Sequence, residues 1–291
     1  MGGRSHLARS GKLKLTFSKM HGAGNDFVVI DLVTQNAQLS AAQVRHIADR
    51  KRGIGCDQVL LVEPPTHPDA DFRYRIFNAD GSEAGQCGNG ARCFGRFVRE
   101  QQLTFKRTLK VQVSDGIMGL EIAKDDSVTA DLGQPIFSPE QIPFETETSA
   151  LEYDLDVAGT THSIGAVSMG NPHAILRVES CDQAPVDVLG PAIESHQRFP
   201  ERVNVGFMQI VNRQEIRLRV FERGAGETEA CGTGACAAAI HGMRLGLLDR
   251  AVTVQLPGGK LQVRWDSDES AVWLGGPTAS VFHGFYQLHH R

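Results

Sequence analysis

Short apolar stretches rich in β-branched residues run through most of the chain, separated by clusters of Gly, Asn, Asp and Pro. Apolar stretches bounded by turn-forming residues in this way are typical of β-strands. They predict strands at residues 13–19, 27–31, 59–62, 74–77, 109–114, 119–123, 128–132 and 205–210. We therefore expect more strand than helix.

Helical patterns occur in three segments. Ser40, followed three residues later by Gln43, forms a capping-box pattern and predicts a helix that runs to about Arg50. Apolar residues recur at helical spacing over residues 91–103 and 234–247, which predicts two longer helices.

The two longer helices have different surfaces. The helix at residues 234–247 is small and apolar on nearly every side, so we expect it to be buried with strands around it. We expect the same of the helix at residues 91–103, except for one solvent-facing side predicted by Arg92, Arg96 and Arg99. Each half of the chain then consists of a mixed sheet around one long helix, which is an α+β fold.

The start of each long helix belongs to a repeated sequence. Cys-Gly-Asn-Gly-Ala at residues 87–91 recurs as Cys-Gly-Thr-Gly-Ala at residues 231–235, 144 positions later. At the same distance, Arg-Ile-Phe at residues 75–77 recurs as Arg-Val-Phe at residues 219–221. Two copies in the same order indicate an internal duplication, and we expect the two halves to be pseudo-symmetric.

Polar residues in the loops also recur at matching positions. The equivalent pairs are Asn25 and Asn171, Gln58 and Asn204, and Asn78 and Glu222. The first two pairs keep an amide in both halves. The third replaces an amide with a carboxylate, so a charge breaks the two-fold relation there.

The repeated sequences also predict the domain boundaries. Leu-Gly-Gln-Pro at residues 132–135 and Leu-Gly-Gly-Pro at residues 274–277 mark equivalent half-ends in a chain whose 291 residues fit two domains of ordinary size. We divide the chain into an N-terminal half, residues 1–131 joined by residues 277–291, and a C-terminal half, residues 132–276. The active site is expected in the cleft between the halves.

Composition narrows the class of partner. An apolar content of 41% and a charged content of 22% are those of a soluble globular protein. The net charge of −4 disfavours nucleic acid or an anionic membrane as a partner, because both usually require a concentrated basic surface. The chain has no apolar run long enough for a secretory signal or a membrane span. We expect a cytoplasmic protein that acts on a small molecule.

The cysteines fall into two groups. Four of the six have the pattern of small buried residues: Cys56, Cys93, Cys181 and Cys236. Cys87 and Cys231 each precede a Gly-x-Gly that begins a helix, where unpaired N–H groups and the positive end of the helix dipole lower the pKa of a thiol. The same N–H groups can bind a carboxylate.

Two thiols facing each other across a cleft suit one reaction in particular. Inversion of a stereocentre beside a carboxylate requires a base on one face and an acid on the other. Cys87 as a thiolate and Cys231 as a thiol supply both, and their roles exchange in the reverse direction. The helix starts direct donors at the carboxylate, where negative charge develops. This scheme requires no metal and no cofactor.

Other functions of the cysteines remain as alternative hypotheses. The spacings of Cys87 to Cys93 and of Cys231 to Cys236 lack the close pairs expected of structural zinc, which leaves a metal or redox role as the weaker alternative. A binding protein that catalyses no reaction is a second alternative. His173 follows the repeated amide at Asn171, and we expect it to lie near the thiols and tune their pKa values.

The motifs together resemble the diaminopimelate epimerase family over nearly all of residues 17–285. The resemblance depends on residues 24–27, 57–58, 77–82, 87–93, 170–173, 203–205, 222–228 and 231–234. It implies two pseudo-symmetric domains that close on the ligand, and a cofactor-independent epimerase that interconverts LL- and meso-2,6-diaminopimelate in lysine and peptidoglycan biosynthesis. Proline and hydroxyproline racemases, which resemble this family in using paired cysteines, are the nearest alternative.

The resemblance also implies roles for individual residues. Cys87 and Cys231 are the acid–base pair, and His173 and Glu222 tune the two thiols. The residues that bind substrate are Asn25, Gln58, Asn78, Gly88, Asn89, Asn171, Asn204, Glu222, Arg223, Gly232 and Thr233. The amides and Arg223 favour a long substrate with a polar distal end.

The resemblance further implies a homodimer, although the sequence departs from the family pattern where the dimer is concerned. Val281 and Phe282 stand where some relatives have a tyrosine that packs in the dimer. Glu229 stands where glutamine is common, and Cys56 where alanine is common. We expect neither of these two departures to affect the chemistry.

Overall fold

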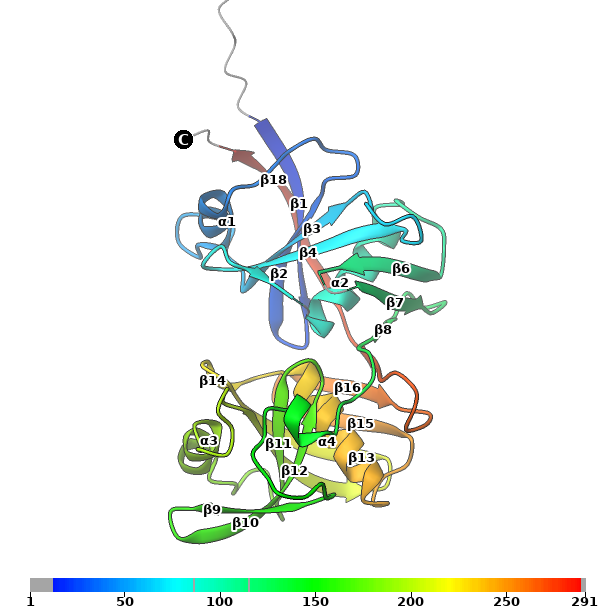
Figure 1. Cartoon of the computed structure of the whole chain (residues 1–291). Helices are drawn as coiled ribbons and strands as arrows, with labels where there is room; N and C mark the ends of the chain where they lie inside the picture. The colour runs from blue at the N-terminus through cyan, green and yellow to red at the C-terminus, as the bar shows by residue number, and fades with distance from the viewer. Residues whose placement is uncertain (1–12, 86, 115, 289–291) are drawn as a thin grey trace, which may run out of the picture.

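The computed structural model describes residues 13–85, 87–114 and 116–288. Figure 1 shows two lobes, with the first half of the chain in one lobe and most of the second half in the other. The chain passes between the lobes after β8 and again before β18, which returns to the first lobe. Among the described residues, no helix combines the length and the apolar character needed to span a membrane.

The first lobe is formed largely by strands. Its strands and helices are β1 (Leu13–Gly22), β2 (Asn25–Asp31), α1 (Ala41–Ala48), β3 (Gln58–Glu63), β4 (Phe72–Asn78), β5 (Glu83–Ala84), α2 (Gly88–Glu100), β6 (Thr108–Val113), β7 (Gly116–Ile122), β8 (Val128–Asp131) and β18 (Ala279–Leu288). β18 pairs antiparallel with β1 over nearly its full length, so the C-terminal strand completes the sheet of the first lobe.

The second lobe repeats this arrangement. Its elements are η1 (Pro139–Gln141), β9 (Tyr153–Val157), β10 (Thr160–Ser168), β11 (Pro172–Arg177), α3 (Val186–Glu194), β12 (Asn204–Asn212), β13 (Glu215–Glu222), β14 (Gly226–Thr228), α4 (Gly232–Arg244), β15 (Ala251–Leu256), β16 (Gly259–Arg264) and β17 (Trp273–Gly276). Parallel and antiparallel pairs occur in both lobes, which confirms the mixed sheet of an α+β fold.

The strand register confirms the duplication. β2 pairs in parallel with β3, and Phe27 lies opposite Gln58. β11 pairs in parallel with β12, and His173 lies opposite Asn204. Both residues of the second pair follow those of the first by 146 positions. α2 and α4 each contain 13 residues and begin 144 positions apart.

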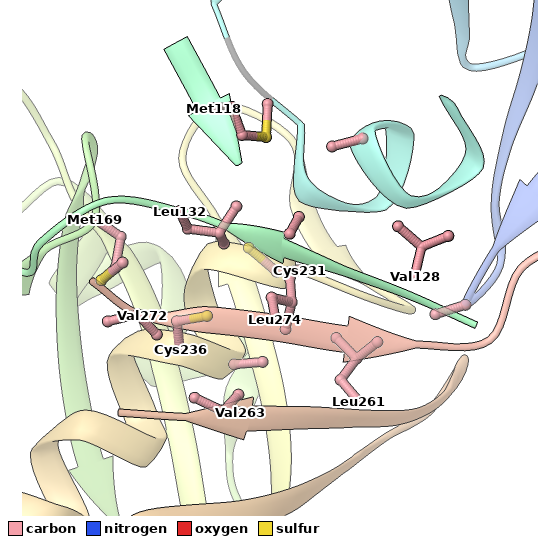
Figure 2. Packing of buried hydrophobic residues seen from close by; sticks show 14 of the residues in the cluster. Met118, Val128, Leu132, Met169, Cys231, Cys236, Leu261, Val263, Val272 and Leu274 are labelled. Atoms are coloured by element: carbon pink, nitrogen blue, oxygen red, sulfur yellow. The ribbon is translucent and has the colours of Figure 1, made fainter. Parts of the chain in front are cut away.

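Buried side chains hold the helices against the sheets. One large apolar cluster surrounds α2 and α4 and extends through both lobes, while smaller clusters pack α1 and α3 against their own sheets. Figure 2 shows the centre of the large cluster, where Leu132 and Leu274 lie close to Cys231. Leu274 lies in β17 and Leu132 follows β8, and these two strands pair with each other and join the two lobes.

Most predicted elements are present, with shifted ends. α1 has the predicted capping box at Ser40 and Gln43, but it ends at Ala48. α2 begins at Gly88 rather than at residue 91, because Cys87 caps it. α4 is buried along most of its length, as its composition predicts.

The prediction of a solvent-facing side on α2 is wrong at Arg92. Arg96 and Arg99 are partly exposed, but Arg92 has a relative exposure of 0%. A Cβ atom built on Gly276 would lie 3.3 Å from the Arg92 guanidinium, and one on Gly22 would lie 3.6 Å from it. The guanidinium therefore occupies a slot between glycines that are distant in the sequence.

Candidate active site

Both long helices begin at one cleft. Cys87 is the N-cap of α2 and Cys231 is the N-cap of α4, each with an extended backbone. The two cysteines line the same cleft, whose volume is about 1430 Å³. All six cysteines of the chain are free thiols.

Cys87 lies between a backbone donor and an amide oxygen. Its Sγ accepts a hydrogen bond from the Gly90 N–H at 3.4 Å, which is the contact expected of an N-cap. The thiol donates to Asn25 Oδ1 at 3.6 Å. Asn25 Nδ2 donates in turn to Asp57 Oδ2 at 3.0 Å, so Asp57 fixes the orientation of the amide.

Cys231 has a different set of neighbours. Its Sγ lies 3.6 Å from the hydroxyl oxygen of Thr233, and the residue is buried. Glu222 stands close enough to act on the thiol electrostatically. The Thr228 hydroxyl donates to Glu222 Oε1 at 2.5 Å and holds this carboxylate in place.

The prediction that the helix starts lower the thiol pKa values is wrong, because both thiols have raised pKa values. Burial raises the pKa of Cys87, although hydrogen bonds from the Gly90 and Asn89 N–H groups and the charge of Arg92 oppose it. Burial also raises the pKa of Cys231, and the Glu222 carboxylate adds to that effect. The helix N–H groups lower the pKa of the thiols as expected, but desolvation of the thiolates raises it by more.

The cleft brings together twelve of the residues singled out from the sequence. Besides the two cysteines, the lining includes Asn25, Gln58, Asn78, Gly88, Asn89, Asn171, Glu222, Arg223, Gly232 and Thr233. Gln58 Nε2 donates to Asn78 Oδ1 at 3.0 Å, which links two of the amides along one wall. Arg223 belongs to the second half of the duplicated chain, and its side chain is exposed.

Asn204 is buried and does not line the cleft. Its Nδ2 donates to Pro172 O at 2.9 Å, and its Oδ1 accepts from the Arg223 N–H at 3.0 Å. Asn204 therefore joins the loop that carries Asn171 to the loop that carries Arg223.

His173 is also placed behind the lining. It is fully buried, and burial lowers its pKa to about 3, so the ring is neutral near pH 7. Its Nε2 lies 3.0 Å from Asn171 Oδ1 and donates to that oxygen, because a carbonyl oxygen can only accept. His173 contacts a lining residue, and its effect on the thiols stays a prediction.

Comparison with known proteins decides the family. The family model described as diaminopimelate epimerase matches residues 17–138 and 165–280. A diaminopimelate epimerase from Thioalkalivibrio sulfidiphilus is 59% identical over 274 residues, covering 94% of this chain and 99% of that protein. One from Azotobacter vinelandii is 54% identical with the same coverage. The chain belongs to the diaminopimelate epimerase family.

Solved structures extend the likeness in fold beyond this epimerase family. A hydroxyproline epimerase from Agrobacterium vitis superposes with a TM-score of 0.67 at 15% identity, covering 96% of this chain and 94% of that one. A phenazine biosynthesis protein from Bacillus anthracis gives 0.65 at 18% identity, covering 95% and 100%. At such identities the likeness shows the fold alone. The hydroxyproline epimerase is a distant structural neighbour, whereas the two diaminopimelate epimerases are more than half identical to this chain.

Sequence reasoning missed a group of charged residues at the cleft. Lys19, Asp26, Arg50 and Asp57 line it and form ion pairs with one another. Burial opposes ionisation of Asp26, but hydrogen bonds from Arg50 and Lys19 hold its pKa well below the usual range. The acidic members directly flank the amides Asn25 and Gln58 in the sequence, and this adjacency was the available signal.

Glu229 is a further residue to which the sequence assigned no role. We expected this departure from the family pattern not to affect the chemistry, and Glu229 lines the cleft. A Cβ atom built on Gly24 would lie 2.9 Å from Glu229 Oε2, so this carboxylate reaches across to the loop that carries Asn25. In the part of the chain that the structure describes, no three His, Cys, Asp or Glu side chains are grouped so as to hold a metal ion.

Proposed function

We propose that this chain interconverts LL- and meso-2,6-diaminopimelate without a cofactor, using Cys87 and Cys231 as the acid–base pair. The observation that carries the proposal is that both cysteines cap helices whose starts line a single cleft. Relatives that are 53–59% identical bear the name diaminopimelate epimerase, which supports the choice of substrate.

The reaction balances with the two thiols alone. One cysteine, as a thiolate, takes the α-proton from one face of the substrate and becomes a thiol. The other cysteine, as a thiol, delivers its proton to the opposite face and becomes a thiolate. In between, negative charge spreads into the substrate carboxylate, where N–H groups at the starts of α2 and α4 stabilise it. The reverse reaction exchanges the two roles.

Side chains around the thiols bind the two polar ends of the substrate. The amides and backbone groups that line the cleft hold the reacting end next to the cysteines. Arg223 offers a two-pronged donor for the distal carboxylate, and Glu222 offers an acceptor for an ammonium group. Asn204 acts through the loops that it joins, and His173 acts through Asn171, by the contacts described above.

The division into lobes supports closure around the substrate. We propose that residues 1–131 with residues 277–291 form one domain and residues 132–276 the other. The chain connections at the ends of β8 and β17 lie beside the cleft, so Leu132 lines it. A rotation about these connections would bring the helix starts closer to the ligand.

We also propose a homodimer. β18 carries the exposed apolar residues Phe282 and Phe285, and in the described residues it pairs only with β1. An apolar strand at a sheet edge is stabilised when a second copy covers it. Analytical ultracentrifugation tests this: Phe285→Asp is expected to shift the protein toward monomer, and Phe105→Asp, at another exposed phenylalanine, is the control. A Phe285→Asp protein that sediments like the wild type would contradict the proposed interface.

We place the protein in the cytoplasm and its reaction in the biosynthesis of lysine and of peptidoglycan precursors. Two thiols that exchange a proton must both remain reduced, and the cytoplasm maintains reduced thiols. The family resemblance supports the pathway.

Incubation with LL-diaminopimelate in deuterated water tests the proposed activity. An epimerase must place solvent deuterium at one α-carbon while the meso isomer accumulates, and both are measured by NMR spectroscopy. Absence of exchange with the wild-type protein would refute the proposed function. Proline and hydroxyproline serve as comparison substrates, and we expect no exchange with either.

A further inference from the structure

Arg92 is a buried cation that the two-thiol mechanism leaves unused. It lies five positions after Cys87 in α2, has no solvent exposure, and fits against two glycines, one at the end of β1 and one in β17. Burying a charge is costly unless it gains partners. Its Nη2 donates to Asn89 Oδ1 at 2.9 Å, and its Nη1 lies 3.5 Å from Gly88 O, at the limit of a hydrogen bond.

The second half of the molecule carries no charge at the equivalent place. The equivalent position of α4 is Cys236, which is also fully buried in the same apolar cluster. The two positions are close enough for the charge of Arg92 to act on Cys236, so a large charged residue and a small apolar one share this contact between the helices. Replacement of a buried charge by an apolar residue is often neutral or stabilising, so stability alone gives no reason for Arg92.

The hydrogen bond to Asn89 has a directional consequence. Arginine has only donors, so the side-chain atom of Asn89 that faces it must be the carbonyl oxygen. Rotating the amide would turn its NH₂ group against the guanidinium. Asn89 lines the cleft next to Cys87, so its amide nitrogen is left as the donor on the cleft side.

We propose that Arg92 is a positioning residue that holds Asn89 with its amide nitrogen facing the cleft and places a fixed positive charge behind Cys87. Asn89 then offers a hydrogen-bond donor to the carboxylate that carries the charge of the reaction intermediate. The charge of Arg92 also favours the ionised form of Cys87, against the effect of burial. This inference rests on the proposed epimerase function.

Arg92→Met is the central test variant, because methionine keeps the length and removes the donors and the charge. Arg96→Met is the matched control, one turn further along α2, where the arginine is partly exposed and pairs with Glu100. We expect Arg92→Met to lower kcat/KM for diaminopimelate by about 10- to 100-fold, less than complete loss of a transition-state donor. Its melting temperature is expected to stay unchanged or rise. Arg96→Met should behave like the wild type.

A double-mutant cycle separates positioning from packing. If Arg92 acts through Asn89, the combination of Arg92→Met with Asn89→Ala should lose little more activity than Asn89→Ala alone. Arg92→Lys, which keeps the charge and one donor, should recover part of the activity. Losses that add independently, or an Arg92→Met enzyme with wild-type kcat/KM, would overturn the proposal.

A second measurement does not depend on the proposed reaction. In a Cys231→Ala background, the rate at which iodoacetamide alkylates Cys87 is followed as a function of pH. Arg92→Met should shift this profile to higher pH, and Arg92→Lys should shift it less. An unchanged profile overturns the proposal even if the wild-type enzyme is active, whereas a shifted profile with an inactive wild type would fault the proposed function instead.

Discussion

The two halves of the molecule share one scaffold and differ in polarity. Arg75 pairs with Glu83 at 2.7 Å in the first half, and Arg219 pairs with Glu227 at 2.6 Å in the second, 144 positions later. The central helices have equal lengths, and each has a cysteine at its N-cap position. At this level the halves are interchangeable, so the backbone presents the two thiols in equivalent ways.

The side chains around the thiols are not interchangeable. Equivalent positions hold Asn78 and Glu222, Arg92 and Cys236, and Phe27 and His173. Glu222 raises the pKa of both thiols, but the positive charge of Arg92 opposes it only at Cys87. The difference teaches that duplication supplied the symmetric geometry that inversion requires, and that later divergence made the two thiols electrostatically unequal.

The largest expected effect comes from removing either thiol. Cys87→Ala and Cys231→Ala should each lower kcat/KM for interconversion by at least about 10²- to 10⁴-fold, because each removes one proton-transfer group. Cys181→Ala is the control, since that thiol donates to Phe207 O away from the cleft. Epimerisation is measured by NMR spectroscopy. If either cleft variant keeps activity within tenfold of the wild type, one cysteine suffices and the two-base mechanism is refuted.

The glycines at the helix starts should respond unequally. A Cβ atom on either Gly88 or Gly232 would lie 2.9 Å from Leu274 Cδ2, but only Gly88 also faces Leu132, at 3.4 Å. We expect Gly88→Ala to lower the free energy of unfolding by about 1–3 kcal/mol through overpacking, and Gly232→Ala to lower it by less. Urea denaturation measures both. Gly119→Ala, whose Cβ would meet atoms no closer than 3.5 Å, should be near neutral, and equal losses at the two helix starts would refute the difference in packing.

His173 should make the second half sensitive to acid. Its folded-state pKa of about 3 lies below the ordinary value of 6.5, so below pH 6.5 the unfolded chain binds a proton that the folded chain does not. Stability is therefore lost as the pH falls, by about 2 kcal/mol between pH 6.5 and pH 5 from this group. In His173→Phe, which copies Phe27 of the first half, the fall in unfolding free energy over this range should be smaller by that amount. An unchanged pH dependence would show that His173 does not contribute to the loss of stability in acid.

The smallest expected effect is a shift of the pH–rate profile when the charge at the equivalent positions 78 and 222 is changed. Glu222→Gln removes a carboxylate that raises the pKa of both thiols, so the limb of the pH–rate profile that requires protonated Cys231 should move to lower pH, and by more than the limb that requires ionised Cys87. Asn78→Asp adds a carboxylate at the equivalent place and should move the limb that requires ionised Cys87 to higher pH. Measured profiles of kcat/KM test both directions. If the two limbs do not move, the charges at these positions act on the substrate alone.

Much of the site could be predicted from local sequence. The capping pattern of Ser40 and the Cys-Gly-x-Gly helix starts depend on neighbouring residues, and the structure contains them. The amides Asn25, Gln58 and Asn171 lie in the cleft because turns and strand ends place them there in both halves. The burial of His173 and Asn204 was not visible, because it depends on how β11 and β12 pair behind the lining.

By itself the sequence determined the duplication, the strands and helices, and the two cysteines at equivalent helix starts, since these follow from spacing within each half. The tertiary structure decided which polar groups lose contact with water. Arg92 is buried because glycines about 70 and 184 positions away lie against it, and the thiols have raised pKa values because both lobes enclose them. Desolvation is a property of everything that surrounds a group, so no local pattern in the chain could reveal it.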